Sequence, residues 1–210
     1  MNFSFKFPAV RGVQAGSEYY ISMVPMGLLG KLFSENTDNT VLPEFRAQRK
    51  LNESRIPEIA NYILKNRKTY VFSALSASID GDFKFISSQD NENVGVLEVD
   101  MNAVFLINDG QHRKAAIERA IIEDESLANE TISIVFFKDE GLARSQQMFT
   151  DLNKHAVKTS NSIATLYDSR DKIGVATNTV INRIPFFKKF TDKEKDLSLI
   201  HISEPTRLAL

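Results

Sequence analysis

One stretch of the chain, FLINDGQHRKAAIERAII (residues 105–122), constrains the fold more than any other. It combines an apolar run, an Asp-Gly turn and a helical pattern in direct succession. Glycine tolerates the positive φ angle that a tight turn needs. We therefore predict a strand that ends at this turn and a helix that begins at Gln111.

The predicted helix has one apolar face when it advances about 100° per residue. That face is formed by small or branched side chains, namely Ala116, Ile117, Ala120 and Ile121. Lys114 and Glu118 are predicted to point away from it, whereas Arg113 points close to its centre. A guanidinium on an apolar face must be paired or must look into a cleft. Arg113 is therefore the residue of this helix that most needs a partner.

Two interpretations of the turn are open. In the first, the turn only holds itself together: Asp109 caps the helix, Arg113 pairs with an internal carboxylate and His112 donates to a backbone carbonyl. In the second, the turn binds an anion, because first-turn N–H groups and the helix dipole favour negative charge and Arg113 adds a cation. Such a site would seat a phosphate or a carboxylate; the cofactor is left open, with a nucleotide as the candidate. The candidate ligand-binding residues are Asn108, Asp109, Gly110, Gln111, His112 and Arg113.

A second polar group, Asn153, Lys154 and His155, lies at the end of the amphipathic segment 141–153, for which we predict a helix. Lysine and histidine at a helix C-terminus also interact favourably with its dipole, and this is the alternative explanation for the group. If this helix end faces the Arg113 turn, the two groups line a pocket for phosphates. We therefore add these three residues to the candidate anion site.

The net charge of the chain is −1, so any site for a polyanion such as DNA must be a local patch. The best candidate is the basic segment with Arg46, Gln48, Arg49, Lys50 and Arg55. Runs of charge are usually solvated surface, which is the alternative here. We predict that this segment contacts DNA. Lys188 and Lys189 are offset by acidic residues that follow them, and we interpret them as solvated surface.

Composition excludes several classes of function. The chain has no cysteine, which excludes disulfides, thiolate nucleophiles and cysteine-bound zinc. With three histidines and no ligand spacing to join them, we predict no metal site. P-loop, GxSxG and HExxH signatures do not occur, which favours a non-enzymatic protein. No window approaches the roughly 18 apolar residues of a membrane span, and we expect a soluble, cytoplasmic protein.

Hydrophobic periodicity predicts strands and helices that mix without a strict repeat. Segment 46–70 predicts a helix that Ser54 caps, with Pro57 in its first turn. Residues 71–79 predict a buried strand, and residues 83–86 its hairpin partner. At 210 residues and 42% hydrophobic content, the chain can bury one substantial core. We predict a single mixed domain of the α+β class.

The C-terminal segment LSLIHISEPTR (residues 197–207) resembles the translation of a transposase adapter used for sequencing libraries. We therefore expect residues 1–196 to form the domain, truncated at its C-terminus, and residues 197–210 to be a non-native tail. His201 is left out of the candidate sites for this reason.

Residues 109–113 spell DGQHR, and four further segments accompany this motif: FPAVRGVQAG, LNESRIPEIANYIL, YVFSALSASIDG and VFFKDEGLARSQQMFTDLNKHAV. Together, between Phe7 and Asp171, they resemble the DndB family, which is associated with DNA phosphorothioate (sulfur) modification. The resemblance implies a prokaryotic DNA-binding regulator of the modification genes. DNA and other proteins of the modification system are the expected partners, and a homo-oligomer is left open.

The motif and layout also resemble, more weakly, the ParB/sulfiredoxin-like fold, in which a strand-turn-helix with Gly and Arg holds a nucleotide. The alternative function is therefore a nucleotide-binding or nucleotide-hydrolysing switch in the same system. A ParB-like nuclease would need a metal and a carboxylate cluster, which cannot be assembled from this sequence.

Overall fold

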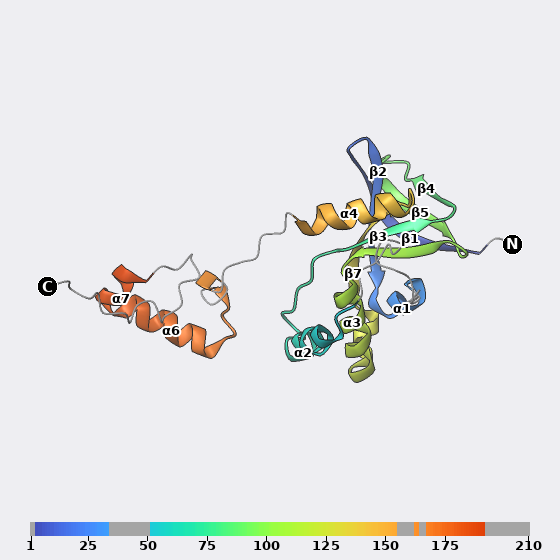
Figure 1. Cartoon of the computed structure of the whole chain (residues 1–210). Coiled ribbons are helices and arrows are strands. Elements are labelled where there is room, and N and C mark those ends of the chain that lie inside the picture. Colours follow the sequence, from blue (N-terminus) through green and yellow to red (C-terminus); the bar gives the residue numbers. More distant parts are fainter. Residues whose placement is uncertain (1–2, 34–50, 155–161, 164–166, 192–210) are drawn as a thin grey trace. The chain divides into compact units, whose positions relative to one another are not determined.

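The chain divides into two compact units, Met1–His155 and Ala156–Leu210. The computed structural model describes residues 3–33, 51–154, 162–163 and 167–191. The first unit contains the sheet, and the described part of the second contains the helices α6 (Lys172–Arg183) and α7 (Pro185–Phe190) (Figure 1). The domain predicted over residues 1–196 spans both units, and its predicted boundary near Asp196 lies outside the described residues.

A seven-stranded sheet organises the first unit, in the order β4-β5-β1-β2-β7-β3-β6. The strands are β1 (Ser4–Gln14), β2 (Ser17–Pro25), β3 (Leu75–Asp80), β4 (Phe83–Ser87), β5 (Val94–Asp100), β6 (Val104–Asp109) and β7 (Thr131–Lys138). Neighbouring strands are antiparallel except β3 and β7, which are parallel. The predicted α+β class is therefore confirmed.

Strand β7 joins the two parts of this sheet. It pairs with β2 on one side, where Ile21 lies opposite Val135, and with β3 on the other, where Ala77 lies opposite Phe136. The four strands β4, β5, β1 and β2 thus connect to β3 and β6 through β7 alone.

The hairpin predicted between residues 71–79 and 83–86 is wrong. Strand β3 begins only at Leu75, and it pairs with β6 and β7. Strand β4 pairs instead with β5, where Phe85 lies opposite Leu97. Gly81, with φ 137°, bends the chain after β3 but does not reverse it. Asp80 lies opposite Val104 and Phe83 lies opposite Val99, so β3 and β4 run in the same direction and cannot pair as a hairpin. The chain reverses later, between β4 and β5.

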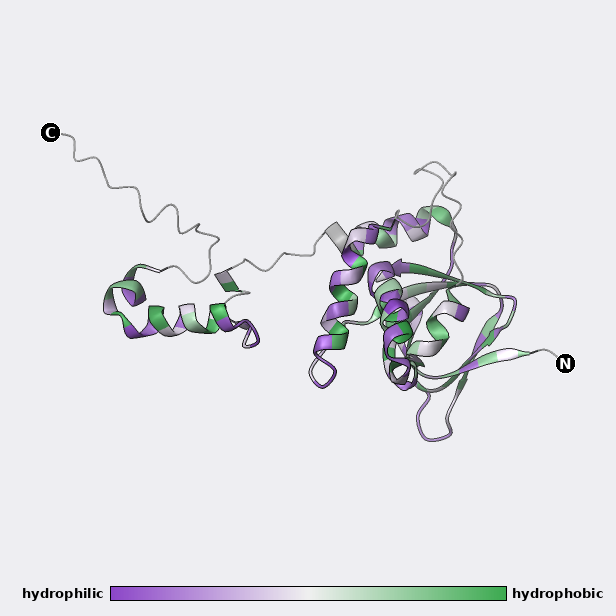
Figure 2. Ribbon diagram, turned by 90° about the horizontal axis from the view of Figure 1, so that it is seen from below, coloured by the Kyte–Doolittle hydropathy of each residue, from purple (hydrophilic) through white to green (hydrophobic). Residues whose placement is uncertain are grey.

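Three helices cover one face of the sheet and α4 (Leu142–Lys154) covers the other (Figure 1). The three are α1 (Leu29–Leu32), α2 (Ile56–Lys65) and α3 (Gln111–Glu123). Their apolar sides, green in Figure 2, pack on a core centred on Phe7, Phe105 and Phe136, whose ring centroids lie 5.7–6.3 Å apart. The predicted helix start at Gln111 is confirmed. Within the described ranges, no helix is long and apolar enough to cross a membrane.

A cluster of charged and hydroxyl groups ties the end of α2 to the 3-10 helix η4 (Glu125–Asn129). Arg67 Nε lies 2.8 Å from Asp124 Oδ2, Arg67 Nη1 lies 2.7 Å from Glu130 Oε1, and Arg67 Nη2 donates to Ser126 Oγ at 2.9 Å. The Tyr70 hydroxyl donates to the second oxygen of Glu130. Because η4 follows α3 directly, this cluster fixes α2 beside α3.

Tyr70 gives this cluster a testable pH dependence. Burial and then the hydrogen bond to Glu130 raise the pKa of Tyr70 to about 12, above the ordinary value of 10.0. The folded state therefore favours the neutral phenol, and its stabilising contribution is complete below pH 10 and is lost as the pH rises toward 12. We expect the difference in free energy of unfolding between wild type and Tyr70→Phe to shrink across this range. Urea denaturation at pH 9 to 12 measures it, and a constant difference would contradict the prediction.

Candidate functional site

The DGQHR turn lies where β6 ends and α3 begins. Gly110 is the N-cap of α3 and has φ 102°, in the left-handed region that favours glycine. A Cβ atom at this position would lie 2.4 Å from Leu75 Cδ2. The turn therefore needs glycine at position 110 for two reasons: its backbone angle and its close approach to β3. None of the described side chains caps α3, so the predicted cap by Asp109 is wrong.

Arg113 is held by groups of its own unit. Its Nη2 forms an ion pair with Asp109, and its Nη1 donates to the Ser73 carbonyl at 3.0 Å and to the Ser73 hydroxyl. The Arg113 side chain is 17% exposed. Because Asp109 pairs with Arg113 four residues later, it is not free to cap the helix. The prediction that Arg113 pairs with an internal carboxylate is confirmed, and the partner is Asp109.

His112 connects the turn to the segment before α2. Its Nε2 accepts a hydrogen bond from the Asn52 backbone N–H at 3.0 Å, across 60 residues of sequence. The Asn52 side chain in turn accepts from the N–H and hydroxyl of Ser54 and caps the 3-10 helix η3 (Glu53–Arg55), which leads into α2. Ser54 is therefore not the predicted cap of α2. The capped turn and the His112 contact fix the position of Asn52 and η3 before α2.

Lys114 does not point away from the core as predicted. It is 8% exposed, and its Nζ lies 2.9 Å from Glu118 Oε2, one helical turn later. Its aliphatic stem is buried while the ammonium group is neutralised by this pair. A helical-wheel projection places Lys114 beside Glu118 but cannot detect that neighbouring elements bury it.

Asn108 lies in a buried polar group on the sheet face that α4 covers. The pairing of β3 with β6 passes from Ala77 opposite Ile107 to Ser76 opposite Asp109, so Asn108 is the extra residue of a β-bulge. Asn108 is 2% exposed, and its Nδ2 donates to Ser78 Oγ at 2.7 Å and contacts Met148 on α4. Asn108 Oδ1 and Ser76 Oγ, both buried, have no hydrogen-bond partner within the part of the chain that the structure describes. These are the two polar atoms beside the turn that a ligand or a water could satisfy.

Sequence reasoning missed the serines of this group and found Asn108. The signal for the serines was present, because Ser76 and Ser78 alternate with Leu75, Ala77 and Ile79. Such alternation predicts a strand with one polar face. Ser73, the second partner of Arg113, has no comparable signal, since it precedes the strand.

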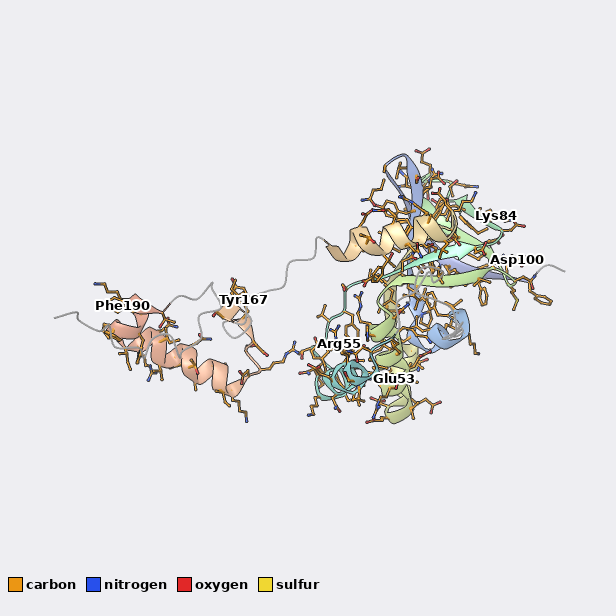
Figure 3. All side chains as sticks on the ribbon, in the orientation of Figure 1. Glu53, Arg55, Lys84, Asp100, Tyr167 and Phe190 are labelled. Atoms are coloured by element: carbon orange, nitrogen blue, oxygen red, sulfur yellow. The ribbon has the colours of Figure 1, made fainter. Side chains whose placement is uncertain are left out.

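The remaining predicted site residues are only partly described. Asn153 and Lys154 end α4, but their side chains lie outside the described set, as does all of His155. Arg46, Gln48, Arg49 and Lys50 also lie outside the described residues, whereas Arg55 is exposed in η3 (Figure 3). Among the residues that the structure describes, no group of three or more His, Asp or Glu side chains could hold a metal ion. The meeting of Asn153–His155 with the Arg113 turn stays a prediction.

Fold and site together define an α+β protein whose strand-turn-helix carries the DGQHR motif beside a mixed seven-stranded sheet. The sequence model of DndB, described as DNA-sulfur modification-associated, matches residues 7–199. The chain therefore belongs to the DndB family, and its context is DNA sulfur modification. None of the curated proteins compared with the chain matches it.

One solved structure with some similarity is that of the C-terminally truncated chromosome-partitioning protein ParB from Caulobacter crescentus, complexed with CTP-gamma-S. The two chains are 16% identical with a TM-score of 0.38, and the match covers 70% of this chain and 63% of that chain. At this TM-score the similarity carries no argument about what this chain binds.

Proposed function

We propose that this protein is a DNA-binding regulator of the genes of a DNA phosphorothioate modification system. The observation that carries the proposal is its membership of the DndB family over residues 7–199. The charge distribution supports it. Residues 46–55 contain four cations and one anion, a net charge of +3, in a chain of net charge −1. A local basic patch of this kind is what phosphate contacts require.

The described contacts explain how the basic segment could be held for binding. Asn52 lies within it, between Lys50 and Arg55, and its backbone N–H is bonded to His112 of the DGQHR turn. Arg55 stands exposed in η3 (Figure 3). Anchoring one end of a segment lowers the conformational entropy that is lost when its side chains bind. In this proposal Arg46, Arg49, Lys50 and Arg55 contact phosphates, and Gln48 reads a base edge.

The proposal is tested with the promoter DNA of the modification genes. We expect the full chain to retard this duplex in a mobility-shift series at lower concentration than an unrelated duplex of equal length. A promoter-reporter fusion should be repressed when the protein is supplied. Equal affinity for both duplexes, with no change in the reporter, would contradict a regulatory role.

A second function, nucleotide binding at the DGQHR turn, is favoured by the two unsatisfied polar atoms of the buried group. Asn108 Oδ1 can only accept a hydrogen bond, so its ligand must present an N–H or O–H group, as a nucleobase amine or ribose hydroxyl does. Within the described ranges no side chain caps α3, and a first turn of this kind can receive a phosphate. The obstacle is Arg113, whose guanidinium must leave Asp109 before it can bind a phosphate.

Arg113→Lys separates these possibilities, because lysine keeps the charge and loses the planar fork. Lysine cannot reach Asp109 and both oxygens of Ser73 together. We therefore expect the variant to lose roughly 1–3 kcal/mol of stability, while any nucleotide affinity follows the folded fraction. Thermal melts and calorimetric titration with nucleoside triphosphates measure the two effects. Arg119→Lys, at an exposed position of α3, is the matched control. A variant with an unchanged melting temperature and lost nucleotide affinity would show instead that Arg113 binds the ligand.

A further inference from the structure

The described helices of the second unit carry positive charge without negative charge. Residues 172–191 contain Lys172, Arg183, Lys188 and Lys189 and no acidic residue, although the whole chain has 27 of them. These twenty residues have a net charge of +4, and the acidic residues nearest to them in the sequence are Asp171, the N-cap of α6, and Asp192. This stretch is complementary to an anionic partner, and it is separate in sequence from the basic segment at residues 46–55.

Three aromatic side chains of α7 lie on the surface of the same unit. Phe186, Phe187 and Phe190 are 60%, 39% and 61% exposed. The Phe186 ring centroid lies 5.7 Å from that of Phe187 and 5.0 Å from that of Phe190. Phe190 follows Phe187 by three residues and Phe186 by four, and both spacings place side chains on the same surface of a helix. Adjacent exposed rings of this size are unusual on a soluble surface and indicate a binding site.

Lysines accompany these rings. Lys188 and Lys189 occupy the last turn of α7, and the Lys189 ammonium lies 5.4 Å from the centre of the Phe190 ring. A ligand for this surface must therefore offer flat apolar groups and closely spaced negative charges together. Single-stranded nucleic acid has this combination, since each unpaired base exposes a π-face and each nucleotide carries a phosphate.

We propose that α7 binds single-stranded DNA, with Phe186 and Phe190 stacking on unpaired bases and Lys188 and Lys189 contacting phosphates. Duplex DNA does not fit, because paired bases hide their faces inside the stack. Membership of a DNA-associated family favours DNA over an anionic lipid surface, the other partner that combines negative charge with apolar groups. The proposal goes beyond the regulatory role, since it concerns a different segment and a different form of DNA. It also replaces the interpretation of Lys188 and Lys189 as solvated surface.

The test uses fluorescence anisotropy of the full chain with a labelled oligo(dT) of about 15 nucleotides, within the range of sites on single-strand-binding proteins. In Phe186→Leu/Phe190→Leu, leucine keeps the apolar character and the helix while removing the rings. We expect about a fivefold to hundredfold loss of oligo(dT) affinity. Phe3→Leu, which alters an exposed ring of the first unit, is the control and should bind as wild type does. Circular dichroism checks that the helices are retained.

Two further experiments test the role of the lysines and the choice of DNA over an anionic lipid surface. Lys188→Gln/Lys189→Gln should lower the salt dependence of oligo(dT) binding by about 1.4 units of log-log slope, at about 0.7 per phosphate contact of a single strand. Both double variants should bind duplex promoter DNA as wild type does. A failure of the regulatory proposal would appear in the binding of duplex DNA, whereas a failure of the present proposal would appear in the binding of oligo(dT), so the two failures are distinguishable. Oligo(dT) binding that is absent, or unchanged by the leucine variant, would overturn the proposal. So would binding to phosphatidylglycerol-containing vesicles that the leucine variant loses while its oligo(dT) affinity stays intact.

Discussion

Replacing Arg46, Arg49 and Lys50 together by alanine is expected to weaken duplex DNA binding by roughly 10²–10³-fold at 0.1 M salt, because three counterion-releasing contacts are lost. The log-log salt slope should fall by about 2.7 units, at about 0.9 per phosphate contact. The loss should be similar on promoter and unrelated duplexes, since phosphate contacts carry no sequence information. Mobility-shift titrations between 50 mM and 300 mM salt measure both quantities.

A second triple variant with the same loss of charge distinguishes the loss of phosphate contacts from a general loss of positive charge. Lys31, Lys65 and Lys68 are exposed on or beside α1 and α2, and their replacement by alanine removes the same three charges. We expect this control to change the affinity modestly and to leave the salt slope close to that of wild type. Equal slopes in the two triple variants would remove the basic segment from the DNA interface.

Gly110→Ala is the single substitution in the turn with the largest expected effect on stability. Alanine at φ 102° is strained by about 1–2 kcal/mol. Its Cβ would also lie 2.4 Å from Leu75 Cδ2 and 3.1 Å from Arg113 Nη2, and overpacking of this kind costs about 1–3 kcal/mol more. We expect a total loss of roughly 2–5 kcal/mol, measured by urea denaturation.

Gly141 provides the matched control for this substitution. It has a comparable φ of 95°, but a Cβ there would meet nothing within 4 Å. Gly141→Ala should therefore cost only the backbone strain of about 1–2 kcal/mol. The difference between the two variants measures the close approach of the turn to Leu75. Equal losses in both would mean that Leu75 and Arg113 move aside without cost.

Local patterns predicted the elements well and their partners poorly. The start of α3 followed from the Asp-Gly turn and the apolar spacing after it, and both are contained in adjacent residues. The pairing of β4 did not follow, because an Asp-Gly signal is the same for a hairpin turn and for the bend that Gly81 makes, whereas the pairing of β3 with β6 and of β4 with β5 depends on residues further along the chain. A local glycine signal does not show whether the chain reverses.

The same limit applies to the site. The need of Arg113 for a partner could be predicted from its position on an apolar face, and Asp109 lay four residues away. The contact between His112 and Asn52 spans 60 residues and leaves no periodic trace in the sequence. The pair of Lys114 with Glu118 is one helical turn long and visible in the sequence, but the burial of Lys114 was missed because it depends on the packing of other elements against α3.

The position of β7 has a consequence for the protein while it is being made. The ribosome releases the chain from its N-terminus, so β2 and β3 emerge long before the strand that both of them need. Until Lys138 has left the exit tunnel, each of these two strands has an edge of unpaired N–H and C=O groups. The nascent chain therefore passes through a period in which it can pair with other chains. Slow or interrupted translation within residues 80–138 lengthens that period, and chaperones have most to protect during it.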